Sequence, residues 1–365
     1  MTYLEIKNRT LNTIEKRTLN FRDPRVPLSS FWISPSTSST RFWQNLPKSM
    51  SPHLATSTNH RHVLYVCLPV CVPRVPVPQF TYCVCPPVCP EVFCKQLQTD
   101  SDLQSILKPL KGYHLSKLMI SGLNATTLQP DVFSGVSVEY LDLEKVEVED
   151  ASFLPGRRHF QGLESSLNTL EIKKSFKNGH RSLINLKLEH LSNLHIAIFE
   201  HNHIPEVGND WFTSGPAGLS TLIFEGNGIE VLGDKAFSAL SELKLLAVAG
   251  NHLTDVSRSM LPKPALSLRT LDLAYNKLRN LPRDLFTDMP SLLDVNLDYN
   301  LIHILAEDTF SSVLQQLTSL SLEGNPLECD EKLKWVCSSE VDVISGKCAQ
   351  SSTSKGRPIA LFCKM

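Results

Sequence analysis

The chain has 365 residues, 42% of them hydrophobic and 20% charged, which is enough for two ordinary domains or one long repeat array. Its formal net charge is −1, but residues 1–62 carry nine Lys/Arg against three Asp/Glu, and the rest carries 27 against 34. The larger part therefore lacks the broad basic surface of a nucleic-acid-binding protein, and no nucleic-acid partner is expected. No apolar run reaches the ~18–20 residues needed to span a membrane, so no stable membrane insertion is expected.

Residues 1–66 are predicted to be a disordered leader. They are rich in Ser, Thr and Arg and poor in acids, a composition that also resembles an organelle transit peptide. The best candidate for a secretory signal is RHVLYVCLPVCV, from Arg61 to Val72, with a basic start and a short apolar core interrupted by prolines. Met50 would be a natural start for this signal, with residues 1–49 as an additional leader.

All ten cysteines lie in two clusters, six from Cys67 to Cys94 and four from Cys329 to Cys363. An even number in each cluster fits disulfides formed in an oxidising compartment, and reduced structural thiols are the alternative. The front cluster contains YCVCPPVCPEVFC, whose spacing fits no common structural zinc site, so disulfides are preferred to a metal. Six cysteines allow fifteen pairings, and the spacing does not choose among them. The front cysteines expected in disulfides are Cys83, Cys85, Cys89 and Cys94.

An internal repeat fills most of the remaining chain. Three early segments, beginning at Leu115, Val138 and Leu167, keep the alternating apolar residues of the repeat but lose its asparagine. Six later segments read L-x-x-L-x-L-x-x-N-x-L, with Ala197 as the second leucine of the first one. They are LHIAIFEHNHI from Leu194, LSTLIFEGNGI from Leu219, LKLLAVAGNHL from Leu243, LRTLDLAYNKL from Leu268, LLDVNLDYNLI from Leu292 and LTSLSLEGNPL from Leu317. The alternation predicts one strand per repeat, and about nine parallel strands over residues 101–325.

The repeated asparagines are predicted to form a buried ladder. They recur every 24 or 25 residues, as Asn202, Asn227, Asn251, Asn276, Asn300 and Asn325. An asparagine side chain both donates and accepts hydrogen bonds, so it can pair backbone groups left without partners where the chain turns after each strand. Replacing one with an apolar residue should cost about 1–3 kcal/mol. The early repeats are degenerate because Leu123, Val146 and Ser175 stand at this position.

This pattern is identified as the leucine-rich repeat, and the resemblance covers roughly residues 101–328. It implies an α/β fold, a curved solenoid with a parallel sheet on its concave face and an irregular or short-helical convex side. A large apolar residue follows each of the first five asparagines by ten positions and is predicted to stack on the convex side. These residues are Phe212, Phe237, Leu261, Phe286 and Phe310.

The segment NPLECDEKLKWVC, from Asn325 to Cys337, follows the last repeat, where the open end of the core needs a cover. It resembles the C-terminal cap of extracellular leucine-rich repeat proteins, N-P-L-x-C-x-C-x-L-x-W, with Glu331 in place of the second cysteine. Trp335 is expected to pack on the final repeat. Four cysteines allow three connectivities, and the resemblance implies the pairs Cys329–Cys348 and Cys337–Cys363.

The front cluster similarly resembles an N-terminal cap of this family. The expected organisation is therefore a leader (1–66), a front cap (67–100), about nine repeats (101–325) and an end cap (326–365).

The sequence holds no motif for catalysis or cofactor binding, such as G-x-S-x-G, H-E-x-x-H, a Walker loop or G-x-G-x-x-G. Asp294 and Asp298 are paired carboxylates, but no base or nucleophile accompanies them in the sequence. His201 and His203 could help to bind a metal or sense pH, although surface turn residues are the preferred interpretation. No catalytic residue, cofactor or metal is predicted. Asn124, in the triplet N-A-T, is the predicted glycosylation acceptor of a secreted chain.

Residues between the strand leucines are predicted to point outward on the concave face, where a partner would bind. The middle of this face is apolar, and an acidic strip with two tyrosines lies beside it; such a strip would favour a basic partner. The alternative is a solvated face without a partner. The predicted binding residues are Ile196, Ile198, Ile223, Leu245, Asp272, Tyr275, Asp294, Asp298 and Tyr299.

The preferred hypothesis is a secreted, disulfide-capped, non-catalytic protein that binds another protein or a glycan. The caps and the repeat number are similar to arthropod proteins related to the non-catalytic leucine-rich repeat subunit of the deep-sea shrimp (Oplophorus) luciferase, a resemblance that implies stabilisation or partner binding. The ectodomain of a cell-surface receptor, or an adhesion or matrix protein, is the alternative, and an enzyme is the least favoured. The oligomeric state is left open.

Overall fold

A computed structural model describes residues 83–84, 91–125, 128–148, 158–176, 186–338, 344–349 and 356–362. All of them belong to one compact unit, His62–Met365. The predicted leader and the proposed secretory signal lie outside the described residues, as do Cys85, Cys89 and Cys363.

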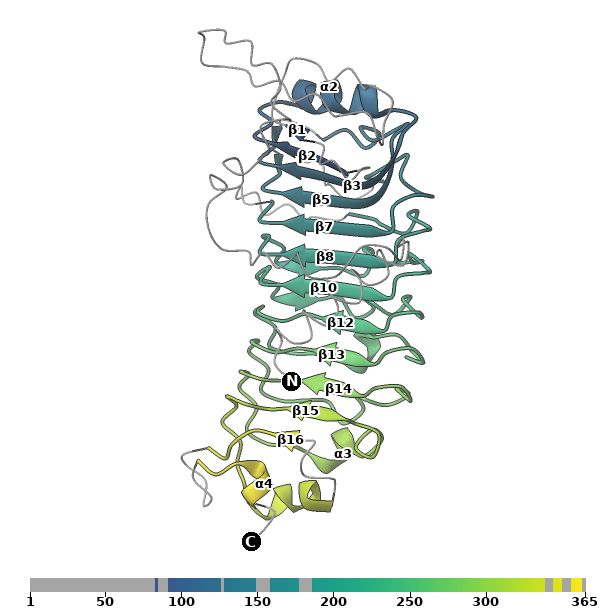
Figure 1. The fold of residues 1–365 in the computed structure, drawn as a ribbon. Coiled ribbons are helices and arrows are strands. Elements are labelled where there is room, and N and C mark those ends of the chain that lie inside the picture. The colour runs from purple at the N-terminus through teal and green to yellow at the C-terminus, as the bar shows by residue number, and fades with distance from the viewer. Residues whose placement is uncertain are drawn as a thin grey trace, which may run out of the picture. The chain divides into compact units, whose positions relative to one another are not determined.

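The described residues form a 12-stranded sheet in which strands follow one another in chain order (Figure 1). The first pair is antiparallel, and every other neighbouring pair is parallel. The strands are β1 (Cys83–Val84), β2 (Glu91–Lys95), β3 (His114–Ser121), β5 (Ser137–Glu144), β7 (Thr169–Lys173), β8 (Ile196–Glu200), β10 (Thr221–Glu225), β12 (Leu245–Ala247), β13 (Thr270–Asp272), β14 (Asp294–Asn296), β15 (Ser319–Ser321) and β16 (Ile344–Ser345). Each predicted repeat supplies one strand from β3 to β15, so the parallel leucine-rich repeat solenoid is confirmed.

The remaining elements are short. Two small parallel sheets join β4 (Asn124–Ala125) to β6 (Glu147–Val148) and β9 (Glu206–Val207) to β11 (Val231–Leu232). The helices are α2 (Asp100–Leu110), α3 (Glu307–Phe310), α4 (Ile359–Phe362) and the 3-10 helices η3 (Arg258–Met260) and η4 (Glu331–Ser338). This small helical content agrees with the predicted irregular or short-helical side of the solenoid.

Helix α2 was not anticipated from the repeat pattern. Thr99 caps it, because its side chain accepts a hydrogen bond from the Asp102 N–H while the Asp102 carboxylate accepts from the Thr99 N–H. Its buried face consists of Leu103, Ile106, Leu107 and Leu110. The helix thus contributes apolar side chains to the core at the N-terminal side of the repeats.

The core is built from columns of equivalent residues in successive repeats. Leu222 of β10, for example, aligns with Ala197 of β8 and Leu246 of β12, and all three are fully buried. The predicted column of large apolar residues, which includes Leu261, is also buried, with ring centroids 6.1 Å apart for Phe212–Phe237 and 5.2 Å apart for Phe286–Phe310. Such close packing favours the constant length of 24 or 25 residues in the six later repeats.

The six asparagines connect neighbouring turns of the solenoid. Asn227 Nδ2 donates to the Phe199 carbonyl at 2.9 Å, and its Oδ1 accepts from the Asn202 N–H at 3.0 Å. Each of the other asparagines makes the same two kinds of bond to the preceding repeat. All six are 1–6% exposed. Ser175 extends this network, since its Oγ accepts from the Val146 N–H at 3.0 Å.

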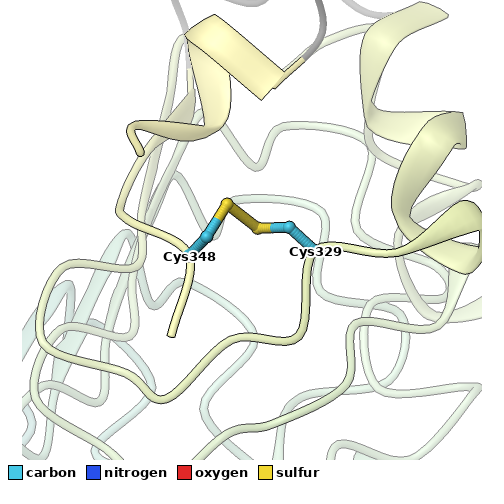
Figure 2. Close-up of a disulfide and its surroundings, with 2 residues drawn as sticks. All are labelled: Cys329 and Cys348. Atoms are coloured by element: carbon cyan, nitrogen blue, oxygen red, sulfur yellow. A yellow bond between two sulfur atoms is a disulfide. The ribbon is translucent and has the colours of Figure 1, made fainter. Parts of the chain in front are cut away.

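The C-terminal segment contacts the end of the repeat array. Cys329 and Cys348 form a disulfide with Cα atoms 5.5 Å apart, the pair that the family resemblance implied (Figure 2). Cys94 and Cys337 each take part in a further disulfide. The Trp335 ring stacks on Phe310 with centroids 5.7 Å apart, and its Nε1 donates to the Leu305 carbonyl at 3.2 Å. Trp335 therefore packs on the final part of the array, as expected.

Candidate functional site

We call the sheet face opposite the leucine core the concave face. In β10, Leu222 and Phe224 point into the core, so Thr221, Ile223 and Glu225 belong to the concave face. Because the strands are parallel and in register, equivalent residues form three rows across the sheet. The central row is Met119, Asp142, Glu171, Ile198, Ile223, Ala247, Asp272, Asn296, Ser321 and Ser345.

The apolar middle of the concave face is a small second core rather than an exposed patch. Ile198, Ile223 and Ala247 form a cluster separate from the leucine core, with Ile196 and Leu245 packed against it. Ile198 is 4% exposed and Ile223 is 6% exposed, so the prediction that they present an open partner surface is wrong. Parallel strands lie ~4.8 Å apart, so branched side chains at the same register cover one another. Ile196 and Leu245 remain partly exposed.

Asp272 also differs from the prediction. It is fully buried in the central row, where its Oδ1 accepts from the Ala274 N–H at 2.9 Å and its Oδ2 accepts from Asn296 Nδ2 at 3.2 Å. Burial raises the pKa of this carboxyl to about 6, against its ordinary value of 3.8. Asp272 therefore supports the sheet and is not available to a partner.

The other two predicted acids are half-buried. Asp298 Oδ1 accepts hydrogen bonds from Ser321 Oγ at 2.7 Å and from the Glu323 N–H at 2.6 Å. Burial raises the pKa of Asp298 above its usual value. Asp294 accepts from Thr318 Oγ1 at 3.0 Å. Both carboxylates remain partly exposed on the concave face, and Asp298 directly precedes Tyr299.

Tyr275 and Tyr299 form the most distinctive part of this face. Their rings stack in parallel, with centroids 4.5 Å apart and planes inclined by 10°, and they are 53% and 52% exposed. Both residues have a left-handed backbone, with φ of +55° and +53°. Bulky residues rarely adopt this conformation, whereas glycine adopts it without cost.

The same position in the other repeats also has a left-handed backbone. Gly226, Gly250 and Gly324 occupy it directly before the ladder asparagine, with φ of +62°, +67° and +71°. Non-glycine residues occupy it in three earlier repeats, as Lys145, Lys174 and His201. Residues held in a strained backbone and exposed to solvent are more frequent at functional sites than elsewhere. The printed sequence contained this signal, because glycine precedes the asparagine in three repeats, tyrosine in two and histidine in one.

A charged cluster on the concave face of the early repeats was missed by the sequence interpretation. Lys117 Nζ lies 3.3 Å from an Asp142 oxygen and 4.0 Å from the Tyr140 ring centroid. Lys173 Nζ lies 2.8 Å from Glu171 and 3.7 Å from Asp142, and the Tyr140 hydroxyl donates to Glu171. Burial, followed by the Glu171 charge, raises the pKa values of Asp142 and Tyr140. The residues come from three degenerate repeats, whose outward positions were not aligned from the sequence.

The remaining predicted residues lie apart from this face or make no site. His201 and His203 are exposed, and the described part of the chain contains no group of three or more potential metal ligands. Asn124 is exposed in β4, where a glycan could be attached. Within the described segments, no helix is both long enough and apolar enough to cross a membrane.

The repeat region is similar in sequence to several known proteins. A family model described as "Leucine rich repeat" matches residues 267–327. The chain is 31% identical to mouse (Mus musculus) podocan over 137 residues, which are 36% of this chain and 21% of podocan. It is 31% identical to rat (Rattus norvegicus) lumican over 117 residues, 31% of this chain and 33% of lumican. It is 29% identical to mouse Toll-like receptor 9 over 114 residues, 31% of this chain and 11% of that receptor. The chain thus spans only a tenth to a third of these relatives.

A solved structure supports the same fold. The crystal structure of the TLR13–ssRNA13 complex superposes with a TM-score of 0.50 at 22% identity, covering 63% of this chain and 32% of that chain. Since that protein is bound to RNA, the fold gives no support to the predicted exclusion of a nucleic-acid partner. The repeat pattern and the solenoid thus agree with the leucine-rich repeat fold, and the family model matches residues 267–327 within it.

Proposed function

We propose that this chain is a secreted, non-catalytic protein that binds and stabilises a protein partner through the concave face of its later repeats. The observation that carries the proposal is the exposed stack of Tyr275 and Tyr299, held in a backbone conformation that the neighbouring repeats fill with glycine. Exposed tyrosines are enriched in protein interfaces because they bury a large area with little loss of side-chain entropy.

The acidic surroundings of the stack favour a basic partner. Asp294 and Asp298 lie on the strand and turn that lead to Tyr299, and both are half-buried rather than hidden. Ile196 and Leu245 are also partly exposed and add an apolar margin on the same face. Charged groups around an aromatic centre steer association and select the partner.

The disulfide chemistry supports an extracellular location. Cys329 and Cys348 form a disulfide with each other, and Cys94 and Cys337 each take part in a further disulfide. Such bonds persist in oxidising compartments and are rare in the cytosol. An exposed asparagine in an N-x-T triplet, Asn124, fits glycosylation on the same route.

The test is capture of partners from extracellular fluid with the purified chain as bait. We expect the double variant Tyr275→Gly/Tyr299→Gly to lose the main partner, because both aromatic contacts are removed without disturbing the turn. The matched control is Leu266→Ser/Ile304→Ser, which changes two side chains that are 59% and 52% exposed elsewhere on the solenoid. Equal capture by the wild type and the folded glycine variant would refute the proposed binding face.

A second candidate is the ectodomain of a cell-surface receptor, favoured by the match to part of Toll-like receptor 9. The two functions predict different locations for the product of the complete gene. Surface biotinylation of expressing cells would label a receptor, whereas a secreted subunit would be recovered from the medium. Recovery only at the cell surface would replace the secreted function with the receptor function.

A further inference from the structure

We infer that Tyr275 is a binding site for a single cationic side chain, an arginine or lysine of a basic peptide segment, on the ring face turned away from Tyr299. This inference rests on the proposed function and identifies the chemistry of the partner's contact. It follows from the order of side chains along the turn, the small residues beside the ring, and the charge of the concave face.

The order of the turn residues determines which ring face is covered. The Tyr275 N–H donates to the Asp298 carbonyl at 2.7 Å, and the Gly250 N–H donates to the Ala274 carbonyl at 2.9 Å, so Tyr275 lies between Gly250 and Tyr299. A Cβ added to Gly324 would lie 2.5 Å from Tyr299 Cδ1, so the Tyr299 ring leans over Gly324. Tyr275 stacks on Tyr299, and its second face is therefore turned toward Gly250.

Small residues lie beside this second face. Gly250 and Gly226 have no side chains, and a Cβ added to Gly250 would meet, among described atoms within 4 Å, only the Gly226 backbone at 3.4 and 3.6 Å. The next ring along the turn belongs to His201, which would lie 3.3 Å from a Cβ at Gly226. An interval about two repeats wide, roughly 10 Å at ~4.8 Å per strand, separates the rings and can accept a planar guanidinium.

The charge of the surrounding face selects a cation. The outward positions of the six strands from β8 to β15 contain acids but no lysine or arginine. The partly exposed acids are Glu225, Asp294, Asp298 and Glu323, the last of which also lies 3.8 Å from Lys347 Nζ, whereas Glu200 and Asp272 are buried. Glu225 and Asp298 hold the equivalent outward positions on either side of Ala249 and Ala274, whose side chains are small. A positive charge over the face of a tyrosine gains from the ring quadrupole as well as from these carboxylates.

The experiment uses a fluorescein-labelled peptide of alternating arginine and serine, with the same peptide carrying neutral citrulline as its matched partner. We expect the full-length protein to bind the arginine peptide about tenfold more tightly than the citrulline peptide. Tyr275→Gly should weaken arginine-peptide binding about two- to fivefold, the size of an exposed cation–π contact, while Tyr275→Phe should preserve it.

The competing outcomes are distinct. Equal binding of the two peptides, or unchanged arginine-peptide binding by Tyr275→Gly, would overturn the cation site. A neutral oligosaccharide that binds in a Tyr275-dependent manner, while the arginine peptide does not, would replace it with a sugar site. If a captured partner still requires Tyr275 while both peptides bind equally, the proposed function stands and only the cation site fails. Circular dichroism of each variant verifies that it is folded.

Discussion

The concave face contains two regions that differ in how their charged side chains are paired. On β3, β5 and β7, Lys117 and Lys173 lie against Asp142 and Glu171, so positive and negative charges neutralise one another within the sheet. On β13, β14 and β15 the outward positions hold acids without lysine or arginine, beside two exposed tyrosines, and Lys347 approaches Glu323 from the segment that follows β16. A region that pairs its own charges gains stability, whereas one that leaves a single sign of charge beside exposed rings is suited to a partner.

The backbone supports of the two regions differ as well. The later repeats have an asparagine in every turn, whereas Leu123 and Val146 replace it in the first two early repeats. Ser175 partly restores the network in the third, by accepting the Val146 N–H and donating to the Lys173 carbonyl. The later region therefore presents its tyrosines from the more regularly bonded scaffold.

The largest expected effect comes from breaking that scaffold. Asn227→Leu should lower the free energy of unfolding by about 4 kcal/mol, above the ~1–3 kcal/mol expected from the sequence, because two buried groups, the Asn202 N–H and the Phe199 carbonyl, each lose a partner. Urea denaturation followed by circular dichroism measures it. Ser175→Ala in the early region removes a smaller side chain from the same network and should cost about half as much. Equal losses for the two variants would contradict the contrast between the regions.

The next effect concerns Asp272, the buried acid of the later region. The pKa of Asp272 is raised to about 6 in the folded chain. Between pH ~4 and ~6 this carboxyl is therefore ionised in the unfolded chain but still largely protonated in the folded chain. The contribution of this carboxyl to the free energy of unfolding is therefore largest below pH ~4, and it falls by about 3 kcal/mol as the pH rises to ~6. Denaturation of the wild type and of Asp272→Asn across this range isolates the contribution, because Asp142 and Asp298 are present in both. Parallel pH curves for the two proteins would refute it.

The smallest effect tests the paired charges of the early region. Lys173→Met should destabilise the chain by about 2 kcal/mol, because Glu171 and Asp142 lose a cation in a largely buried setting. The matched control is its neighbour Lys174→Met, whose lysine is 50% exposed and lies 3.5 Å from Glu144; it should change stability by less than about 0.5 kcal/mol. Thermal unfolding at neutral pH compares them. Similar melting temperatures for the two variants would show that the cluster does not stabilise the sheet.

Much of the fold was predictable because each signal repeats. The L-x-L alternation predicted a strand in every repeat, including the degenerate ones, and the asparagine spacing predicted the turns of the six later repeats. Helix α2 was not found, because it occurs once and has no equivalent in the other repeats. The left-handed backbone of Tyr275 and Tyr299 could have been predicted from the sequence, since glycine at the equivalent positions of other repeats indicates this conformation.

The sequence by itself determined which residues point toward the core and which point away, because alternation along a strand depends only on local backbone geometry. Exposure was decided by the tertiary structure. Ile198, Ile223 and Asp272 point away from the core as expected, yet neighbouring strands bury them, since shielding depends on what stands at the same register one repeat away. The same lateral registration brings Lys117, Asp142 and Glu171 together from three repeats. It also turns two separate tyrosines into a single stacked surface.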